Sequence, residues 1–265
     1  MSGSSLAVDL VLVENWLKEA GKIALSQRKV IETSSKPDNT LVTEADMQIE
    51  NFLVENIIRS YPGHQVLAEE GGVHGSDSEF LWALDPIDGT RAFASGLPMW
   101  GISIGVLYRG IPHAGWINIP TTREIYRGFV DRAFYNNQPL QPNGNIDIQN
   151  PLAFMAVPSN AHLLYDISFP RLRSLGSTTV HLAYVARGIA TAALTRRVRI
   201  WDLAAVLPIL SAVGIGLTYL SGKSFQVHNL LDGRLSPEPI VAAPINILED
   251  IRGLIRIKPS NWAQE

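Results

Sequence analysis

The chain has 265 residues, 46% of them hydrophobic, with a formal net charge of −3 and no cysteine. Such a chain can bury a large core, which excludes general disorder, and it can form no disulfide, thiolate nucleophile or cysteine-based zinc site. Basic and acidic residues are mixed throughout, which gives no footprint for nucleic acid or an anionic membrane and favours small-molecule chemistry.

The N-terminal segment predicts a long amphipathic helix. From Val8 to Lys29, apolar residues recur at helical spacing. One apolar stripe contains Val8, Leu12, Trp16, Ala20 and Ile23. The segment Met1 to Leu25 lacks a basic n-region, and Asp9 and Glu14 interrupt its apolar stretch, so we expect no signal peptide and a cytoplasmic protein.

A polar segment, Thr33 to Thr40, ends this helix, and a second helix is predicted from Glu44 to Ser60, with Pro62 and Gly63 as its stop. Short apolar runs then predict strands, two of them joined by a hairpin-like turn at Arg109-Gly110. The expected strands are Gln65–Ala68, Leu81–Leu84, Ser103–Tyr108, His113–Ile119 and Ile125–Phe129.

The segment from Asn136 to Asn150 is rich in Asn, Gln, Pro and Gly and is the best candidate for a boundary between two halves, 1–145 and 146–265. Beyond it, strands and helices again alternate. We expect strands at Ala153–Val157, Arg171–Ser174 and Ala190–Thr195, and helices near Tyr165 and at Thr178–Ala186. Alternation in blocks predicts an α/β fold of layered sheets covered by helices.

One uncharged run, Leu203 to Leu220, is long enough for a membrane span to be considered. Pro208, Gly214 and Gly216 divide it, which favours a buried helix of about three turns followed by a short strand, Leu217–Leu220. We therefore expect no membrane partner.

The segment Trp82 to Thr90 is the most informative part of the chain. It sets Asp85 and Asp88 three residues apart, where an apolar strand is expected to end and Pro86 to turn the chain. Two carboxylates this close repel unless one is protonated or a cation lies between them, and Mg²⁺ is a suitable oxygen-loving ion. Backbone N–H groups from Gly89 to Arg91 then favour a phosphate at a helix start. An ordinary Asp-Pro and Asp-Gly turn is the alternative.

Three further motifs shift the balance toward a metal and phosphate site. They are Leu41-Val42-Thr43-Glu44-Ala45-Asp46, Ala68-Glu69-Glu70-Gly71-Gly72 and Trp201-Asp202-Leu203-Ala204-Ala205. Together with Trp82 to Thr90, their order and separations resemble those of the inositol monophosphatase family. The resemblance implies an αβαβα five-layer sandwich of the inositol monophosphatase and fructose bisphosphatase type, with the metal site between the halves. It also implies a homodimer and inhibition by lithium.

The resemblance further implies the site residues. Four carboxylates, one carbonyl and one hydroxyl would bind metal or act in catalysis: Glu69, Asp85, Ile87 (carbonyl), Asp88, Thr90 (hydroxyl) and Asp202. Four carboxylates carry about −4 charge, which two or three Mg²⁺ ions would offset. Asp46 and Thr90 would orient and deprotonate the attacking water, with Glu69 as a further catalytic residue.

Several of these residues also have a purely structural interpretation. Thr43-Glu44-Ala45-Asp46 fits a capping box, and Asp202 could be the N-cap of a helix beginning at Leu203. Lys36 matches a family lysine near the nucleophile region, but a lone lysine is more often solvated.

Specificity is expected in the second half of the chain. Ser177, in the loop Arg173 to Thr178, together with Gly89 and Thr90, is assigned to the substrate and its phosphate. Thr195 stands where inositol monophosphatases have a glutamate that binds a substrate hydroxyl. Arg197 and Arg199 would share one face of an extended chain and could bind a second phosphate or a carboxylate, or could line a solvated edge.

The expected substrate is a small phosphomonoester, with inositol phosphate or a close analogue first. Histidinol phosphate comes second, because Trp100 and Pro208 look like features of the histidinol-phosphatase branch. A sugar bisphosphate or a nucleotide 3′-phosphate follows. A catalytically silent relative that binds metal and phosphate is the alternative from another class. The presence of all the ligand residues argues against it. Ala212 to Ile215 depart from the Glu-Ala-Gly-Gly that the family tends to have there, which bears on the packing behind Asp202.

Overall fold

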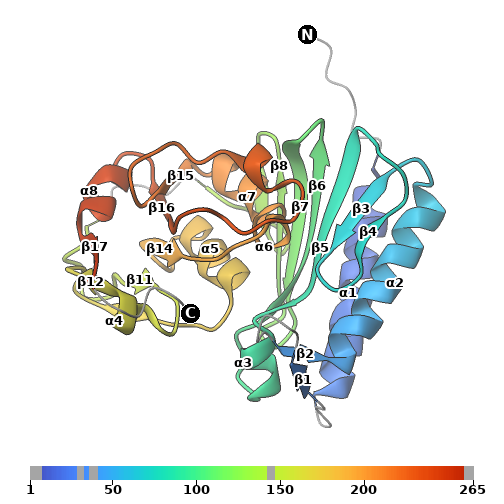
Figure 1. Cartoon of the computed structure of the whole chain (residues 1–265), viewed down its shortest axis with the longest axis horizontal. Helices are drawn as coiled ribbons and strands as arrows, with labels where there is room; N and C mark the ends of the chain where they lie inside the picture. The colour runs from blue at the N-terminus through green and yellow to red at the C-terminus, as the bar shows by residue number, and fades with distance from the viewer. Residues whose placement is uncertain (1–7, 29–32, 36–40, 142–146, 260–265) are drawn as a thin grey trace.

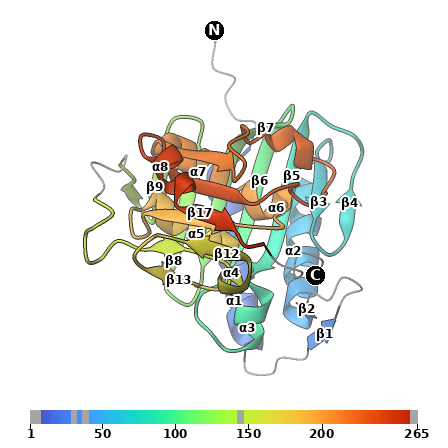
Figure 2. The same cartoon turned by 60° about the vertical axis from the view of Figure 1, so that its left-hand side comes forward.

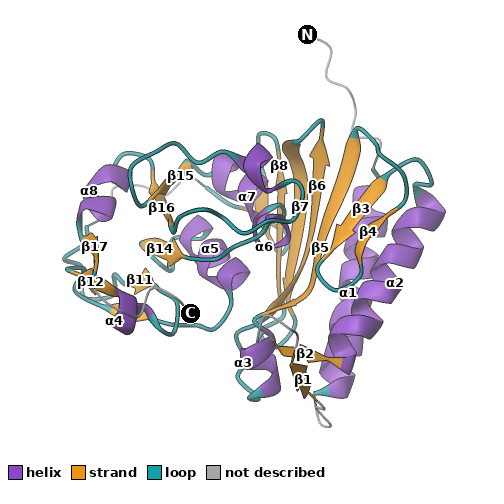
Figure 3. Cartoon of the chain, in the orientation of Figure 1, coloured by secondary structure: helices purple, strands orange, loops and turns teal. Residues whose placement is uncertain are grey.

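The computed structural model describes residues 8–28, 33–35, 41–141 and 147–259. Five layers follow one another across the molecule: two long helices, a large sheet, a central layer of helices, a smaller sheet and an outer layer of short helices (Figures 1 and 3). This arrangement confirms the predicted αβαβα sandwich.

The first layer consists of α1 (Leu10–Gln27) and α2 (Glu44–Ser60). Helix α1 begins later than the apolar periodicity suggests, because the carboxylate of Asp9 caps it by accepting the N–H groups of Val11 and Leu12, each at 3.0 Å. Helix α2 has the predicted bounds and the predicted capping box, in which the Thr43 N–H donates to Asp46 at 2.8 Å. The motif therefore starts the helix, and it also places Asp46 in a buried position.

The large sheet has the strand order β10-β9-β8-β7-β6-β5-β3-β4 and is antiparallel except for the pair β3 and β5. Its strands are β3 (Gln65–Ala68), β4 (Gly72–His74), β5 (Phe80–Asp88), β6 (Gly101–Tyr108), β7 (Ile111–Ile119), β8 (Glu124–Phe129), β9 (Ala133–Tyr135) and β10 (Gln138–Pro139). The turn predicted between β6 and β7 is present, with positive φ at both Arg109 and Gly110. A two-stranded ribbon, β1 (Thr33–Ser35) with β2 (Leu41–Thr43), precedes the sheet.

Strand β5 does not end at Leu84 as expected but continues to Asp88. Its register against β6 pairs Asp85 with Ser103 and Asp88 with Gly101, so β5 holds one extra residue between these pairs. Such a bulge accommodates Pro86, which has no N–H to give to the ladder. The expected turn at Pro86 was therefore wrong, and both carboxylates lie on one irregular strand.

The smaller sheet has the order β13-β11-β14-β16-β15 and mixes parallel and antiparallel pairs. Its strands are β11 (Met155–Ala156), β13 (Leu172–Arg173), β14 (Ala192–Thr195), β15 (Ile215–Tyr219) and β16 (Ile240–Pro244). The outer layer holds α4 (Ala161–Leu164), α8 (Leu248–Gly253) and the pair β12 (Tyr165–Ile167) with β17 (Ile255–Ile257). The helix expected near Tyr165 thus ends just before that residue.

The central layer consists of α5 (Thr178–Ala186), α6 (Ile200–Leu203) and α7 (Val206–Ala212). A short 3₁₀ helix, η1 (Val227–Leu230), follows β15 in the chain. Helices α6 and α7 pack on the large sheet, α6 against β5 and β6 (Figures 1 and 2). One continuous apolar core joins these helices to both sheets. The expected boundary at 145/146 falls in 142–146, outside the described residues.

The uncharged run from Leu203 to Leu220 folds as the end of α6, then α7, then β15. The expected single helix is thus two short helices, followed by the expected strand. Within the described part of the chain, no helix combines the length and the apolar character needed to cross a bilayer.

Small residues allow the central helices to approach the large sheet. A Cβ built on Gly115 of β7 would overlap the carbonyl oxygen of Ala205. We expect Gly115→Ala to lower the free energy of unfolding by about 1–3 kcal/mol, because overpacking forces the backbone to shift. Thermal unfolding measures this, with Gly63→Ala as the control, since a Cβ there meets no heavy atom within 4 Å. Equal midpoints for the two variants would contradict the prediction.

Candidate metal and phosphate site

Three carboxylates from different parts of the chain converge between the two sheets. Asp85 and Asp88 come from β5 and Asp202 from α6, and their oxygens lie within 4.8 Å of one another. They line a cavity of about 210 Å³. Its walls contain Glu69, Asp85, Ile87, Asp88, Gly89, Thr90, Arg91, Gly176 and Asp202. The structure thus brings together every residue that the sequence assigned to the metal.

Asp202 reaches the cavity because α6 begins two residues before it, at Ile200. Its carboxylate accepts the N–H of Arg199 at 2.6 Å and lies inside the first turn of the helix. The interpretation of Asp202 as the N-cap was therefore wrong by one turn, since the helix starts at Ile200 and not at Leu203.

The negative charges of these carboxylates repel one another in a site with little solvent. Burial, followed by the charges of Glu69, Asp88, Asp202 and Asp46, raises the pKa of Asp85 well above its ordinary value. Burial also raises the pKa of Asp202, and the charges of Asp88 and Glu69 add to the rise. A metal ion would remove this repulsion.

The oxygen Oδ1 of Asp85 supports the same conclusion. It is buried and has no hydrogen-bond partner among the described residues, which is costly for a carboxylate oxygen. A ligand set of carboxylate, carbonyl and hydroxyl oxygens suits a hard divalent ion such as Mg²⁺. The residues present therefore fit a metal.

Asp88 is held by the N-terminus of α5. Ser177 Oγ donates to its carboxylate at 2.6 Å, the N–H of Thr178 donates at 3.3 Å, and the N–H of Thr179 also donates. Burial raises the pKa of Asp88, and these hydrogen bonds oppose the rise. Ser177, expected to contact the substrate, is thus a partner of Asp88 and the N-cap of α5, which ties the first half of the chain to the second.

Gly89 and Thr90 follow β5 directly and start the short helix α3 (Thr90–Ala94). Gly89 has φ of 92°, and a Cβ there would come within 2.9 Å of the carbonyl oxygen of Gly176. Only glycine meets both demands. The Thr90 hydroxyl donates to the carbonyl of Ile87 at 3.0 Å, so these two expected oxygen ligands lie side by side.

The loop carrying Glu69 is held by Glu50 of α2, which the sequence motifs did not single out. The buried Glu50 carboxylate accepts the N–H of Glu70 at 2.8 Å and that of Gly71 at 2.5 Å. The available signal was an acid on the apolar face of an amphipathic helix, one turn after Asp46 and next to Ile49.

We expect Glu50→Gln to lower the free energy of unfolding by about 1–3 kcal/mol and to weaken Mg²⁺ binding, because one amide oxygen replaces two acceptors for the buried N–H groups. Denaturant unfolding and calorimetric Mg²⁺ titration measure the two effects. Glu55→Gln, on the exposed face of the same helix, is the matched control. Unchanged stability and Mg²⁺ affinity would show that Glu50 does not hold the loop.

Two of the remaining candidates differ in where they lie. Thr195 is buried at the end of β14 and lines a second cavity, of about 170 Å³, that shares Asp88 and Gly176 with the first. Arg199 donates to the carbonyl of Gly233 at 2.5 Å, and its guanidinium lies over Trp201.

The expected extended chain through Arg197 and Arg199 is wrong, because Arg197 has φ of 54° and breaks it. Arg196, and not either of these arginines, is among the residues that line the second cavity. Lys36 lies outside the described residues.

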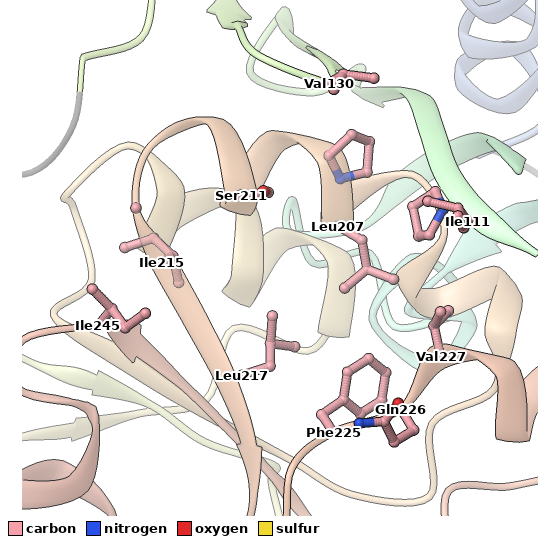
Figure 4. Close-up of a pocket in the computed structure, with 13 residues that line it drawn as sticks. Ile111, Val130, Leu207, Ser211, Ile215, Leu217, Phe225, Gln226, Val227 and Ile245 are labelled. Carbon is pink, nitrogen blue, oxygen red and sulfur yellow. The ribbon is translucent and has the colours of Figure 1, made fainter. Parts of the chain in front are cut away.

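A larger cavity, about 550 Å³, lies away from the carboxylates between the β6–β7 turn, α7 and β15. Figure 4 shows its apolar walls, including Leu207, Leu217 and Phe225. Pro208 lines this cavity, whereas Trp100 is buried in the core against Phe93. Neither residue lines the two cavities near Asp88, so both act through packing.

Fold and site together define a layered α/β protein with a buried polycarboxylate centre suited to divalent metal and phosphate. Residues 8–244 match the model of the inositol monophosphatase family. The chain belongs to this family of metal-dependent phosphatases, which act on small phosphate substrates.

Individual relatives agree with this assignment. The chain is 34% identical to an inositol-1-monophosphatase of Bacillus subtilis, over 85% of this chain and 91% of the relative. It is 32% identical to a histidinol-phosphatase of Chlorobaculum parvum, over 78% and 83%. The solved structure of the extragenic suppressor protein suhB from Bartonella henselae matches with a TM-score of 0.80 and 21% identity, covering 92% of this chain and 97% of that one, and supports the fold alone.

Proposed function

We propose that this phosphatase uses Mg²⁺ to hydrolyse a small phosphate monoester. Two or three Mg²⁺ ions would offset the charge of about −4 that the four carboxylates carry. The observation that carries the proposal is the cluster of the buried Asp85 and Asp88 with the half-buried Asp202, in which one oxygen of Asp85 lacks a protein partner among the described residues. Glu69, the Ile87 carbonyl and the Thr90 hydroxyl line the same cavity and complete the ligand set.

Mg²⁺, when bound, would neutralise the phosphate and make its phosphorus easier to attack. The N–H groups of Gly89 and Thr90 would orient the phosphate oxygens. Asp46 and Thr90 would orient the attacking water, with the proton passing from water to Thr90 Oγ1 and from Thr90 to the Asp46 carboxylate. Glu69 would support the reaction as a carboxylate ligand of the metal. Attack forms one P–O bond and breaks the ester P–O bond, and the departing alcohol oxygen takes its proton from solvent.

For the substrate, we propose inositol phosphate or a close analogue first. The inositol-1-monophosphatase of Bacillus subtilis supports this choice. Histidinol phosphate is second, supported by the relative in Chlorobaculum parvum. A sugar bisphosphate follows, supported by 28% identity to a fructose-1,6-bisphosphatase/inositol-1-monophosphatase of Aquifex aeolicus, and a nucleotide 3′-phosphate comes last. Thr195, in place of the family's glutamate, argues against strict inositol specificity.

We further propose a cytoplasmic homodimer that is inhibited by lithium and has no nucleic-acid or membrane partner. Its N-terminal half, 1–145, would carry most metal ligands. Its C-terminal half, 146–265, would carry Asp202 and the specificity segments.

The test is phosphate release from inositol 1-phosphate, histidinol phosphate, fructose 1,6-bisphosphate and adenosine 3′,5′-bisphosphate, each with Mg²⁺ and with a chelator. Turnover of one member that needs Mg²⁺ supports the proposal and identifies the branch. No release from any member, with Mg²⁺ shown to bind by calorimetry, would favour a silent metal- and phosphate-binding relative.

A further inference from the structure

The second cavity, which adjoins the metal site, has an unusual mixture of groups on its wall. It shares Asp88 and Gly176 with the metal cavity, so a phosphate bound at the carboxylates places the rest of its ester here. Its volume of about 170 Å³ corresponds to the room that about five or six waters occupy in the liquid. This is room enough for a small alcohol portion.

Hydroxyl groups dominate this wall. They belong to Ser159, Ser174, Ser177, Thr178 and Thr195. These groups suit a polar, oxygen-rich ligand but do not select its charge.

One residue gives the cavity a positive charge. Arg196 lines it, whereas the neighbouring His181 is neutral near pH 7 because burial lowers its pKa to about 4. His181 Nε2 accepts the N–H of Leu175 at 2.9 Å, which is a structural role. Among the residues that the structure describes, no carboxylate forms an ion pair with Arg196. Its charge is available to a ligand.

Arg196 also lies near the hydroxyl of Tyr165. Burial raises the pKa of the Tyr165 hydroxyl, and the positive charge of the nearby Arg196 guanidinium opposes the rise. Tyr165 itself is buried at the start of β12.

We propose that Arg196 is a specificity-determining residue that binds a second anionic group, a carboxylate or a phosphate, on the alcohol portion of the substrate. This assignment rests on the proposed phosphomonoesterase function and, within it, moves sugar bisphosphates and other esters with a second negative charge close to the reacting phosphate ahead of inositol phosphate and histidinol phosphate.

The test compares kcat/KM within two matched pairs of esters in Mg²⁺. Glycerol 3-phosphate and 3-phosphoglycerate differ by a carboxylate, and fructose 1-phosphate and fructose 1,6-bisphosphate differ by a phosphate. We expect the wild type to prefer the more anionic member of at least one pair by tenfold or more, about the effect of a single charge-assisted hydrogen bond. The pair with the larger ratio identifies the group.

Arg196→Gln should reduce this ratio about tenfold, and Arg196→Lys should restore part of it. Arg197→Gln is the matched control, because Arg197 is exposed and is not among the residues lining the cavity. Dissociation constants of the same pairs, measured by calorimetry with Ca²⁺ in place of Mg²⁺, provide a readout independent of turnover.

Turnover or binding with a charge ratio near one, or a ratio that Arg196→Gln leaves unchanged, would overturn the assignment of Arg196 and leave the phosphatase function standing. Absence of turnover and binding for all four esters, with phosphate release from inositol 1-phosphate or histidinol phosphate, would overturn the role of Arg196 alone. Absence of release from those two substrates as well would contradict the proposed function and, with it, the role of Arg196.

Discussion

Replacing Asp88 with asparagine is expected to reduce kcat/KM for the best substrate by about 10³-fold or more. Asp88 is the carboxylate on which the two halves of the site meet. It accepts Ser177 Oγ–H and two N–H groups of α5, and it lies with Asp85 and Asp202 at the metal cavity. Asparagine keeps the size of the side chain but removes the negative charge and turns an N–H₂ group toward other donors. Loss of about 4 kcal/mol of transition-state stabilisation corresponds to about 10³-fold in rate.

Steady-state kinetics at saturating Mg²⁺ measure this effect. Asp250→Asn is the control, because Asp250 is exposed on α8. A thermal midpoint close to that of the wild type would show that Asp88→Asn is folded, so that the lost rate belongs to the site. Activity within tenfold of the wild type in the folded variant would exclude Asp88 from metal binding and catalysis.

The second large effect is on stability. Without metal, the wild type should lose stability relative to Asp85→Asn as the pH rises from about 4 toward 8. The pKa of Asp85 is raised in the folded state by burial and by neighbouring carboxylates. Between its ordinary pKa of about 4 and the raised one, the folded protein binds more protons than the unfolded chain. The carboxyl's contribution to stability is therefore present at low pH and is lost as the pH rises through the raised pKa.

The comparison with Asp85→Asn isolates this contribution, because other acids also titrate over this range, Asp88 and Asp202 in the same direction and some in the opposite one. Asp232, for example, has its pKa lowered to about 2 by hydrogen bonds from Arg234. Mg²⁺ should reverse the order of the two proteins at pH 8. At a hundred times its dissociation constant it adds about 2.7 kcal/mol, or about 5–10 °C for a chain of this size.

Differential scanning fluorimetry at several pH values, with Mg²⁺ and with a chelator, tests the prediction. Parallel pH curves for the two metal-free proteins would show that Asp85 is not destabilised by its neighbours. Equal midpoint shifts with Mg²⁺ would show that Asp85 does not bind the metal.

Elements with strong local signals were predictable to the residue. Helix α2 runs from Glu44 to Ser60 as expected, because a capping box fixes its start and Pro62-Gly63 follows its end. Helix α5 also has its predicted bounds, with Ser177 as its N-cap. Strand β5 continues past its predicted end at Leu84, because its last residues pair with β6 through a bulge that the local sequence does not specify.

The candidate site divides in the same way. The motifs identified the acidic residues that converge at the metal cavity, because carboxylates set close to turn residues and glycines are a local signal. They did not identify Glu50, Arg196 or the N–H groups of Thr178 and Thr179. Each of these lies far in the chain from the group that it meets. Glu50 accepts a hydrogen bond from the loop after β3, Arg196 lines the second cavity, and α5 donates to Asp88.

The sequence by itself determined the family, the layered α/β class and which acidic residues to propose as ligands, since these depend on residue types at short, fixed separations. Only the tertiary structure decided that Asp85 and Asp88 stay on one bulged strand, that Asp202 meets them from α6, and that Arg196 faces the second cavity while Arg199 does not line it. Strand register and helix docking set these positions. Both depend on pairings between distant segments, which have no counterpart in the local sequence.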